Sequence, residues 1–104
     1  MLRRKTRVRS VSLKRAAQQR LYSQDRKAWL AVRPWCERCA KERGIPVRST
    51  DVHHTRGRAG RLLCDVRHWV ALCRGCHDWV QMHPREARQA GYLAAPGQWN
   101  VYVP

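Results

Sequence analysis

The sequence predicts a small α+β domain, in which cysteines hold together a two-stranded hairpin and the helix that follows it, with a basic helix ahead of them. Three observations support this fold class. A chain of 104 residues has the length of one domain and buries only a thin core, so an added cross-link is expected. The cysteines include two CxxC pairs, and an extended run with two adjacent histidines lies between these pairs.

The N-terminal third is basic and divides into an arm and a helix. Residues 1–11 contain five basic residues and no acidic one, which is typical of a mobile arm. From Ser12 to Arg33, apolar residues recur at spacings of four and seven, which predicts a helix, and Pro34 ends it. We therefore assign residues 1–33 to a basic arm and helix, and 34–104 to the cysteine-containing domain with its C-terminal tail.

The central region, from Trp35 to about Gly91, contains all the cysteines and histidines. The stretch "IPVRSTDVHHT" at 45–55 predicts a strand, "RGRAGR" a turn, and "LLCDV" at 62–66 the returning strand. After "WVALC" at 69–73, the stretch "CHDWVQMHPREARQAG" predicts a helix that stops at Gly91 and breaks or restarts at Pro84.

Packing roles are expected for the tail and for most tryptophans. The tail, "YLAAPGQWNVYVP", has the alternation of a short strand that packs over the core, with Trp99, Val101 and Val103 on one side. Trp35, Trp69 and Trp79 occupy positions where they could shield the cysteines. Stacking on an unpaired base stays open for a tryptophan that is exposed.

The charge is strongly positive and indicates a polyanionic partner. Lys and Arg number 22 against 7 Asp and Glu, which gives a formal net charge of +15. Basic groups that contact phosphates release condensed counterions, so nucleic acid is the expected partner and an anionic membrane surface the weaker alternative. No apolar run approaches the roughly 18 residues of a membrane span, and no signal-like stretch begins the chain, so we expect a soluble intracellular protein.

The CxxC spacing predicts a structural zinc site at Cys36, Cys39, Cys73 and Cys76. A gap of two residues lets both thiolates of a pair turn onto one ion, and two such pairs form the closed tetrahedral site that structural zinc prefers. Two disulfides or a redox pair are the alternative. The fifth cysteine, Cys64, is expected to be a buried apolar residue rather than a reactive thiol.

The paired histidines are expected to have different roles. Successive side chains of a strand point to opposite faces, so His53 and His54 cannot share one environment by simple packing. His77 follows Cys76 directly, and on the first turn of the predicted helix it can face the hairpin. Taken alone, two adjacent histidines on a strand would be interpreted as surface residues.

The stretch "DVHHTRGR", followed by "VRHWVALCRGCHDWV", resembles the HNH endonuclease family in its zinc-knuckle form, which occurs widely in phage and bacterial genomes. The resemblance covers residues 36–83 and implies the ββα-metal fold. It further implies hydrolysis of DNA phosphodiester bonds that leaves a 5′ phosphate and a 3′ hydroxyl. A cytoplasmic protein of a bacterium, phage or prophage, with phage packaging proteins as partners, would fit it.

The resemblance also implies a role for each histidine of the motif. His53 matches a ligand of the catalytic divalent ion, which would be Mg²⁺, Mn²⁺ or Ni²⁺, and His77 matches the later histidine that completes its protein ligands. His54 matches the general base that activates water. A neutral imidazole suits this role, because its unperturbed pKa is about 6.5.

Two further histidines are ambiguous. His68 stands at the family's middle position, where the usual asparagine pins the loop between strand and helix. An imidazole cannot reproduce the geometry of an amide, and a third metal ligand is an alternative reading of His68. For His83, a place on the surface or at a helix end is favoured over a role as ligand.

Basic residues beside the motif are expected to bind the substrate backbone. Arg56, Arg58 and Arg61 lie in the turn after the histidines and could clamp the phosphates that flank the cut, although a solvated turn is the alternative. Sequence-independent affinity is expected from the arm and first helix, through Arg3, Arg4, Lys5, Arg7, Arg9, Lys14, Arg15 and Arg20. A zinc-stabilised module that binds nucleic acid with weak or no catalysis remains the second hypothesis.

Overall fold

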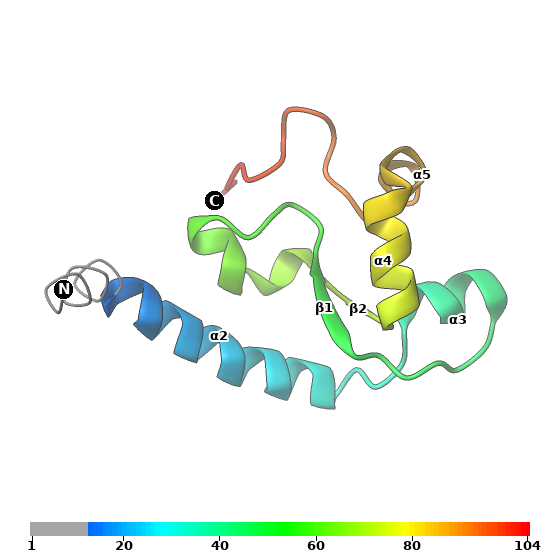
Figure 1. The fold of residues 1–104 in the computed structure, drawn as a ribbon, viewed down its shortest axis with the longest axis horizontal. Coiled ribbons are helices and arrows are strands. Elements are labelled where there is room, and N and C mark those ends of the chain that lie inside the picture. Colours follow the sequence, from blue (N-terminus) through cyan, green and yellow to red (C-terminus); the bar gives the residue numbers. More distant parts are fainter. Residues whose placement is uncertain (1–12) are drawn as a thin grey trace, which may run out of the picture.

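The computed structural model describes residues 13–104 and has the predicted α+β composition (Figure 1). The predicted arm, with Arg3, Arg4, Lys5, Arg7 and Arg9, lies outside the described residues. The elements in chain order are the helices α2 (Leu13–Ala31) and α3 (Glu37–Arg43), the strand β1 (Asp51–His54), the 3₁₀ helices η1 (Gly60–Cys64) and η2 (Val66–His68), the strand β2 (Trp69–Leu72), and the helices α4 (Arg74–Met82) and α5 (Pro84–Gln89). None of the helices within residues 13–104 is both long and apolar enough to cross a membrane.

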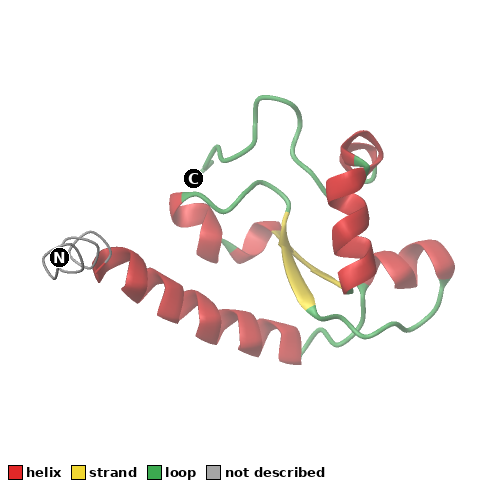
Figure 2. Ribbon diagram, viewed as in Figure 1, coloured by secondary structure: helices red, strands yellow, loops and turns green. Residues whose placement is uncertain are grey.

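Strands β1 and β2 form an antiparallel hairpin at the centre of the domain (Figure 2). His53 pairs with Val70, and His54 pairs with Trp69. Because side chains alternate along a strand and paired residues share a face, the two histidines point to opposite faces of the hairpin. Helix α2 lies along one side of this hairpin, and α3, α4 and α5 lie on the other.

Each side of the hairpin has its own apolar core. The α2 side contains the buried residues Tyr22, Val52, Leu63 and Trp69. The other side contains three of the CxxC cysteines together with other apolar residues, namely Cys36, Cys39, Leu72, Cys76, Val80, Ala87 and Tyr92. Helix α2 therefore shares a core with the hairpin, and each core is too small to hold many large side chains.

The prediction of a returning strand at 62–66 is wrong. Most of this stretch belongs to the 3₁₀ helix η1, and the strand that pairs with β1 is β2. Leu62 and Leu63 are adjacent and both buried, at 1% and 5% exposure. A strand would point one of them outward, whereas the tight 3₁₀ turn buries both. The strand predicted over 45–55 is shorter than expected, covering only Asp51–His54, with one isolated bridge that pairs Trp35 with Arg48.

The helix predictions are confirmed within two residues. Helix α2 ends at Ala31, shortly before Pro34. The predicted interruption lies at Pro84, which occupies the first turn of α5, where its missing N–H costs no hydrogen bond. Gly91 ends the helical region shortly after α5. Its φ of 88° lies in the left-handed range that glycine adopts without strain.

The tail is not the predicted strand, since residues 93–104 form an irregular strap. Its backbone bonds singly to the loop after β1: the N–H of Ala94 donates to Thr55 O at 2.8 Å, and that of Asn100 to Arg56 O at 2.7 Å. Isolated carbonyls of this kind offer no continuous ladder to a strand. The apolar side chains Trp99, Val101 and Val103 consequently stay 40–51% exposed.

The strap is fixed to the loop by a close approach that only glycine permits. The side-chain Oδ1 of Asn100 accepts from the N–H groups of Arg58 and Ala59, at 3.2 and 3.3 Å. Gly57 has a φ of 103°, and a Cβ added to it would lie 2.0 Å from Asn100 Oδ1. A side chain at Gly57 would therefore force the strap away.

We expect Gly57→Ala to lower the free energy of unfolding by roughly 1–3 kcal/mol, through backbone strain and loss of these hydrogen bonds. Gly75→Ala is the matched control. Gly75 lies within α4 with no atom near its added Cβ, so alanine there should be neutral or stabilising by up to about 1 kcal/mol. Chemical denaturation of both variants measures the difference, and equal stabilities would contradict the assigned contact.

Candidate functional site

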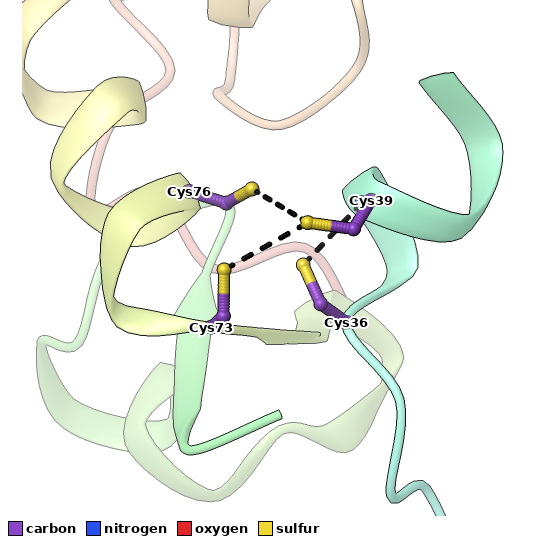
Figure 3. Close-up of side chains that lie close together, drawn as sticks. All are labelled: Cys36, Cys39, Cys73 and Cys76. Carbon is purple, nitrogen blue, oxygen red and sulfur yellow. Dashed lines mark hydrogen bonds between the residues drawn. The ribbon is translucent and has the colours of Figure 1, made fainter. Parts of the chain in front are cut away.

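The four CxxC cysteines converge, as predicted, to form one potential metal site (Figure 3). Their sulfur atoms all lie within 4.8 Å of one another, and Cys39 Sγ is 3.9 Å from Cys73 Sγ and 3.6 Å from Cys76 Sγ. Zinc–sulfur bonds of about 2.3 Å in a tetrahedron place sulfurs about 3.8 Å apart. A disulfide would need about 2.05 Å. The cluster can therefore hold a metal ion and is compatible with structural zinc.

Two helix starts bring these thiols together. Cys36 caps the N-terminus of α3, where its sulfur accepts a hydrogen bond from Cys39 N at 3.4 Å. Gly44, at a φ of 65°, ends this short helix and returns its N–H to the last carbonyls. On the facing element, Cys73 immediately precedes α4 and Cys76 lies in its first turn. Each CxxC pair is thus one helical turn with both sulfurs on one side.

The surroundings of the cluster favour thiolates at one position and oppose them at others. Burial raises the pKa of the Cys39 thiol, but hydrogen bonds from Arg43 and neighbouring cysteines outweigh it and lower that pKa to about 7. Burial raises the pKa of Cys76 to about 12 and also raises that of Cys36. A bound divalent cation would offset this cost, because metal binding and thiol deprotonation are coupled.

Two arginines lie where they can balance the charge of a metal-bound cluster. Four thiolates around one divalent ion carry a net charge of −2. Arg38 Nη1 donates to Cys76 Sγ at 3.4 Å, and Arg43 Nη2 donates to Cys39 Sγ at 3.1 Å. Arg38 is held in place by Glu42, at 3.1 Å, and by Trp79, whose ring centroid is 3.6 Å from its guanidinium carbon.

We expect Arg38→Met to weaken zinc binding about 10-fold, because partners of ligating atoms typically contribute 10- to 100-fold to metal affinity. Arg48→Met is the control: it removes the same charge, but Arg48 lies over the ring of Trp35 and contacts no sulfur. Competition with a chromophoric chelator gives both affinities. Equal affinities for the two variants would show that Arg38 acts only through net charge.

The remaining cysteine and the tryptophans divide between the two cores. Cys64 is partly buried against the α2-side core and lies outside the cluster, and burial raises its pKa, in line with a packing role. Trp79 packs beside the cysteines as expected. Trp69 belongs to the α2-side core instead, and Trp35 is 51% exposed, so neither matches the shielding role expected for it.

The three histidines of the motif line one cavity of about 490 Å³. His53 lies on the α4 face, and its ring centroid is 5.2 Å from that of His77. His54 lies on the α2 face, where its ring is 5.5 Å from Tyr22 and 5.7 Å from Trp69. Imidazoles from both faces of the hairpin therefore border the same space.

Each of these rings has one nitrogen occupied by a hydrogen bond to the protein. Nε2 of His53 donates to Tyr92 O at 2.5 Å, and Nε2 of His54 donates to Leu63 O at 3.0 Å. Because a carbonyl only accepts, the proton of each neutral ring is on Nε2 and a lone pair is on Nδ1. In His77 the arrangement is reversed: Nδ1 lies 2.8 Å from Asp51 Oδ2, so in a neutral ring Nε2 is the nitrogen with the lone pair.

Asp51 is a site residue that the sequence analysis missed. Its carboxylate accepts from His77 and from Thr50 Oγ1, and Arg74 Nη1 lies 3.5 Å away. Burial opposes ionisation, but these partners prevail and lower the pKa of Asp51. A carboxylate behind a histidine is a common arrangement for orienting a metal ligand. Its position two residues before His53, on the same strand face, was the available signal.

Burial keeps the two strand histidines uncharged at neutral pH. His53 and His54 are 4% and 5% exposed. Burial lowers the pKa of His53 and lowers that of His54 to about 4, with the positive charge of Arg58 adding to the effect on His54. Both rings therefore have lone pairs available at pH 7.

His68 and His83 do not line the histidine cavity. The His68 ring lies beside Asp65, with Nε2 3.9 Å from Oδ2, and its carbonyl accepts from Thr55 N and Oγ1, at 2.9 and 3.2 Å. The backbone of His68, rather than its side chain, thus connects the loop to the end of β1. His83 is exposed between α4 and α5 and stacks on Trp79, in line with the surface reading.

The three arginines of the predicted clamp have different surroundings. Arg58 lines the histidine cavity, and its guanidinium carbon lies 5.3 Å from the ring centroid of Tyr22. Arg56 is engaged by the strap, donating to Val101 O at 3.1 Å and to Gln98 Oε1 at 3.3 Å. Arg61 lies near Tyr102 and does not line the cavity. Only Arg58 is brought to the histidines.

No protein-family model matches the chain, and no curated protein or solved structure matches it either. The likeness to the HNH endonucleases therefore rests on the motif residues of the chain itself.

Proposed function

We propose that the protein is a metal-dependent endonuclease of the HNH type that hydrolyses DNA phosphodiester bonds. In this proposal His54 is the general base, and His53 and His77 hold the catalytic divalent ion. The main supporting observation is that all three imidazoles line one cavity, each with one nitrogen fixed by a protein acceptor and the other carrying a lone pair.

The donor atoms around the cavity fit a catalytic rather than a structural cation. His53 Nδ1 and His77 Nε2 belong to the two rings that meet on the α4 side of the hairpin, and Asp51 orients the second ring. Within residues 13–104, the cysteine cluster is the only group of three or more converging ligands. Two protein ligands leave positions for phosphate oxygens and water, and a bound Mg²⁺, Mn²⁺ or Ni²⁺ would stabilise charge on the phosphoryl and departing 3′ oxygens.

His54 is positioned to accept a proton from water. Its Nε2–H is fixed to Leu63 O, and Tyr22 and Trp69 flank the ring, so Nδ1 is the atom that takes the proton. A base with a pKa of about 4 is weak, but a phosphodiester bound beside it brings negative charge that raises this pKa. Arg58 would contact the phosphate from the same cavity.

The net charge supports DNA as the substrate. A formal charge of +15 on 104 residues favours binding to a polyanion, mostly without regard to base sequence. Affinity should consequently fall steeply as salt rises.

The second candidate is a zinc-stabilised module that binds nucleic acid with little or no catalysis. The burial of His53 and His54 favours it, because only 4% and 5% of these residues is exposed to an incoming substrate. Histidine at position 68, in place of the family's asparagine, favours it as well.

Plasmid nicking separates the two candidates. The zinc-loaded protein is incubated with supercoiled DNA, first without and then with added Mg²⁺, Mn²⁺ or Ni²⁺. The nuclease converts the plasmid to open-circular or linear forms only when the ion is added, and leaves 5′ phosphates that ligase can seal. Binding without conversion under every ion would favour the module. Chelators are avoided, because they would strip the structural site too.

A further inference from the structure

The residues that line the histidine cavity fall into two groups of different chemistry, called here its polar wall and its apolar wall. The polar wall includes the three histidines, Arg58 and Arg88. The other is apolar and comes mainly from the strap and the start of α5, through Pro84, Leu93, Ala94, Ala95, Pro96 and Trp99. A sugar–phosphate backbone can use the first wall, but it offers no flat apolar face to the second.

Trp99 is the largest side chain of the apolar wall, and its backbone is fixed on both sides. It is 51% exposed although it lines the cavity. The preceding residue, Gln98, accepts from Arg56, and the following one, Asn100, bonds to Arg56 O and to the N–H groups of Arg58 and Ala59. The strap returns from α5 toward η1, as Figure 1 shows, and presents this indole beside the histidines. A large exposed ring on a fixed backbone is suited to binding a flat partner.

We propose that this apolar wall binds one unpaired nucleobase, stacked on Trp99, next to the phosphate placed at the histidines. The inference rests on the proposed nuclease function and specifies its substrate as DNA with an unpaired nucleotide. Bases within a duplex already stack on their neighbours on both faces, so only an unpaired or displaced base can offer a face to the indole.

The size and charge of the cavity agree with this occupant. Its volume of about 490 Å³ lies within the roughly 300–1,000 Å³ of sites that enclose small organic groups. Arg58 and Arg88 also line it, and neither forms an ion pair with a carboxylate of residues 13–104. Their positive charges remain available for the phosphates on either side of the base.

Binding to two matched duplexes tests the proposal. One duplex carries a single bulged 2-aminopurine, and in the other the same 2-aminopurine is paired with thymine. The full-length zinc-loaded protein is used without added divalent ions, so that binding proceeds without cleavage. Anisotropy of an end label gives the dissociation constant, and quenching of 2-aminopurine reports stacking on an indole.

The variants separate stacking from folding. Trp99→Leu keeps an apolar side chain against the strap but removes the aromatic face, and Trp99→Phe keeps a smaller face. Trp35→Ala is the matched control, because Trp35 is also 51% exposed but does not line the cavity. Thermal melts confirm that each variant is folded.

We expect the wild type and Trp35→Ala to prefer the bulged duplex and to quench its 2-aminopurine. Trp99→Leu should weaken binding to the bulged duplex by roughly 5- to 150-fold, the range for loss of one base–aromatic stack, and should leave the paired duplex unchanged. Trp99→Phe should fall between them. Equal losses on both duplexes, or no loss on either, would overturn the proposal.

Cleavage of the same duplexes with Mn²⁺ tests the stacking site separately from the proposed nuclease function on which it rests. A preference for the bulge that persists without any cleavage would support the stacking site and contradict the nuclease. Cleavage of both duplexes at equal rates, without a preference in binding, would support the nuclease and contradict the stacking site.

Discussion

DNA cleavage is expected to fall by roughly 100- to 10,000-fold in His54→Gln, the range that a positioned general base contributes, while zinc binding and the fold are retained. His54 supplies the lone pair on Nδ1, because its Nε2–H is committed to Leu63 O. A glutamine amide can still donate to that carbonyl but has no basic nitrogen. The substitution therefore removes the proton acceptor and keeps the structural hydrogen bond. Rates of plasmid nicking with Mn²⁺ measure the loss.

His83→Gln is the matched control for this variant. His83 is exposed beside Trp79 and does not line the cavity, so its replacement should leave nicking unchanged. Zinc content and thermal midpoint are measured for both proteins. A folded, zinc-loaded His54→Gln protein that cuts as fast as the wild type would remove His54 from the mechanism.

The second large effect is expected on the fold itself. Cys76→Ser should abolish tight zinc binding and, with it, the cooperative unfolding transition. Cys76 Sγ lies 3.6 Å from Cys39 Sγ and joins α4 to α3 across the cluster. Structural zinc sites contribute apparent binding free energies of about 10–16 kcal/mol, which exceeds the total stability of most small domains. The core on this side includes three of the cysteines, so little apolar packing remains without the ion.

Cys64→Ser provides the comparison, because Cys64 lies outside the cluster. It should bind one zinc per chain and unfold cooperatively with modestly lower stability. Elemental analysis and calorimetry give the two quantities. A Cys76→Ser protein that melts as sharply as Cys64→Ser would show that apolar packing alone holds the domain.

The parts of the fold that were predicted correctly are those specified by short-range pattern. CxxC spacing lets both thiolates of a pair turn onto one ion, and two such pairs complete a tetrahedral site, so the cluster was predictable from four positions. The helix before Pro34 and the break at Pro84 follow from the chemistry of proline. Each of these signals acts within a few residues.

The errors came where tertiary contacts override the local pattern. The stretch at 62–66 and the tail both look like strands in isolation, but the strand that pairs with β1 is β2. Leu62 and Leu63 instead bury together in a 3₁₀ turn, and the tail bonds to a loop. The alternation of apolar and polar residues in a short segment does not indicate whether it will pair with a sheet edge.

The three histidines of the candidate site were predictable from the sequence, but Asp51 and the hydrogen-bonding atoms of each ring were not. The motif indicated His53, His54 and His77, and these three line one cavity. Which nitrogen of each ring is occupied depends on acceptors 9 to 39 residues away, such as Leu63 O and Tyr92 O. Arg56 was assigned to phosphate on the basis of sequence proximity, but folding directs its guanidinium to the strap.

The position of the hairpin between two separate cores means that the reaction would depend on two independent supports. His54 is buttressed by Tyr22 of the N-terminal helix, whereas His53 and His77 meet on the side that the cysteines stabilise. Shortening the N-terminal helix would then misplace the proton acceptor while sparing the cation ligands, and emptying the cysteine cluster would do the reverse. In the proposed nuclease, helix α2 would therefore support the general base, through the contact between Tyr22 and His54, in addition to any contribution of its positive charge to DNA binding.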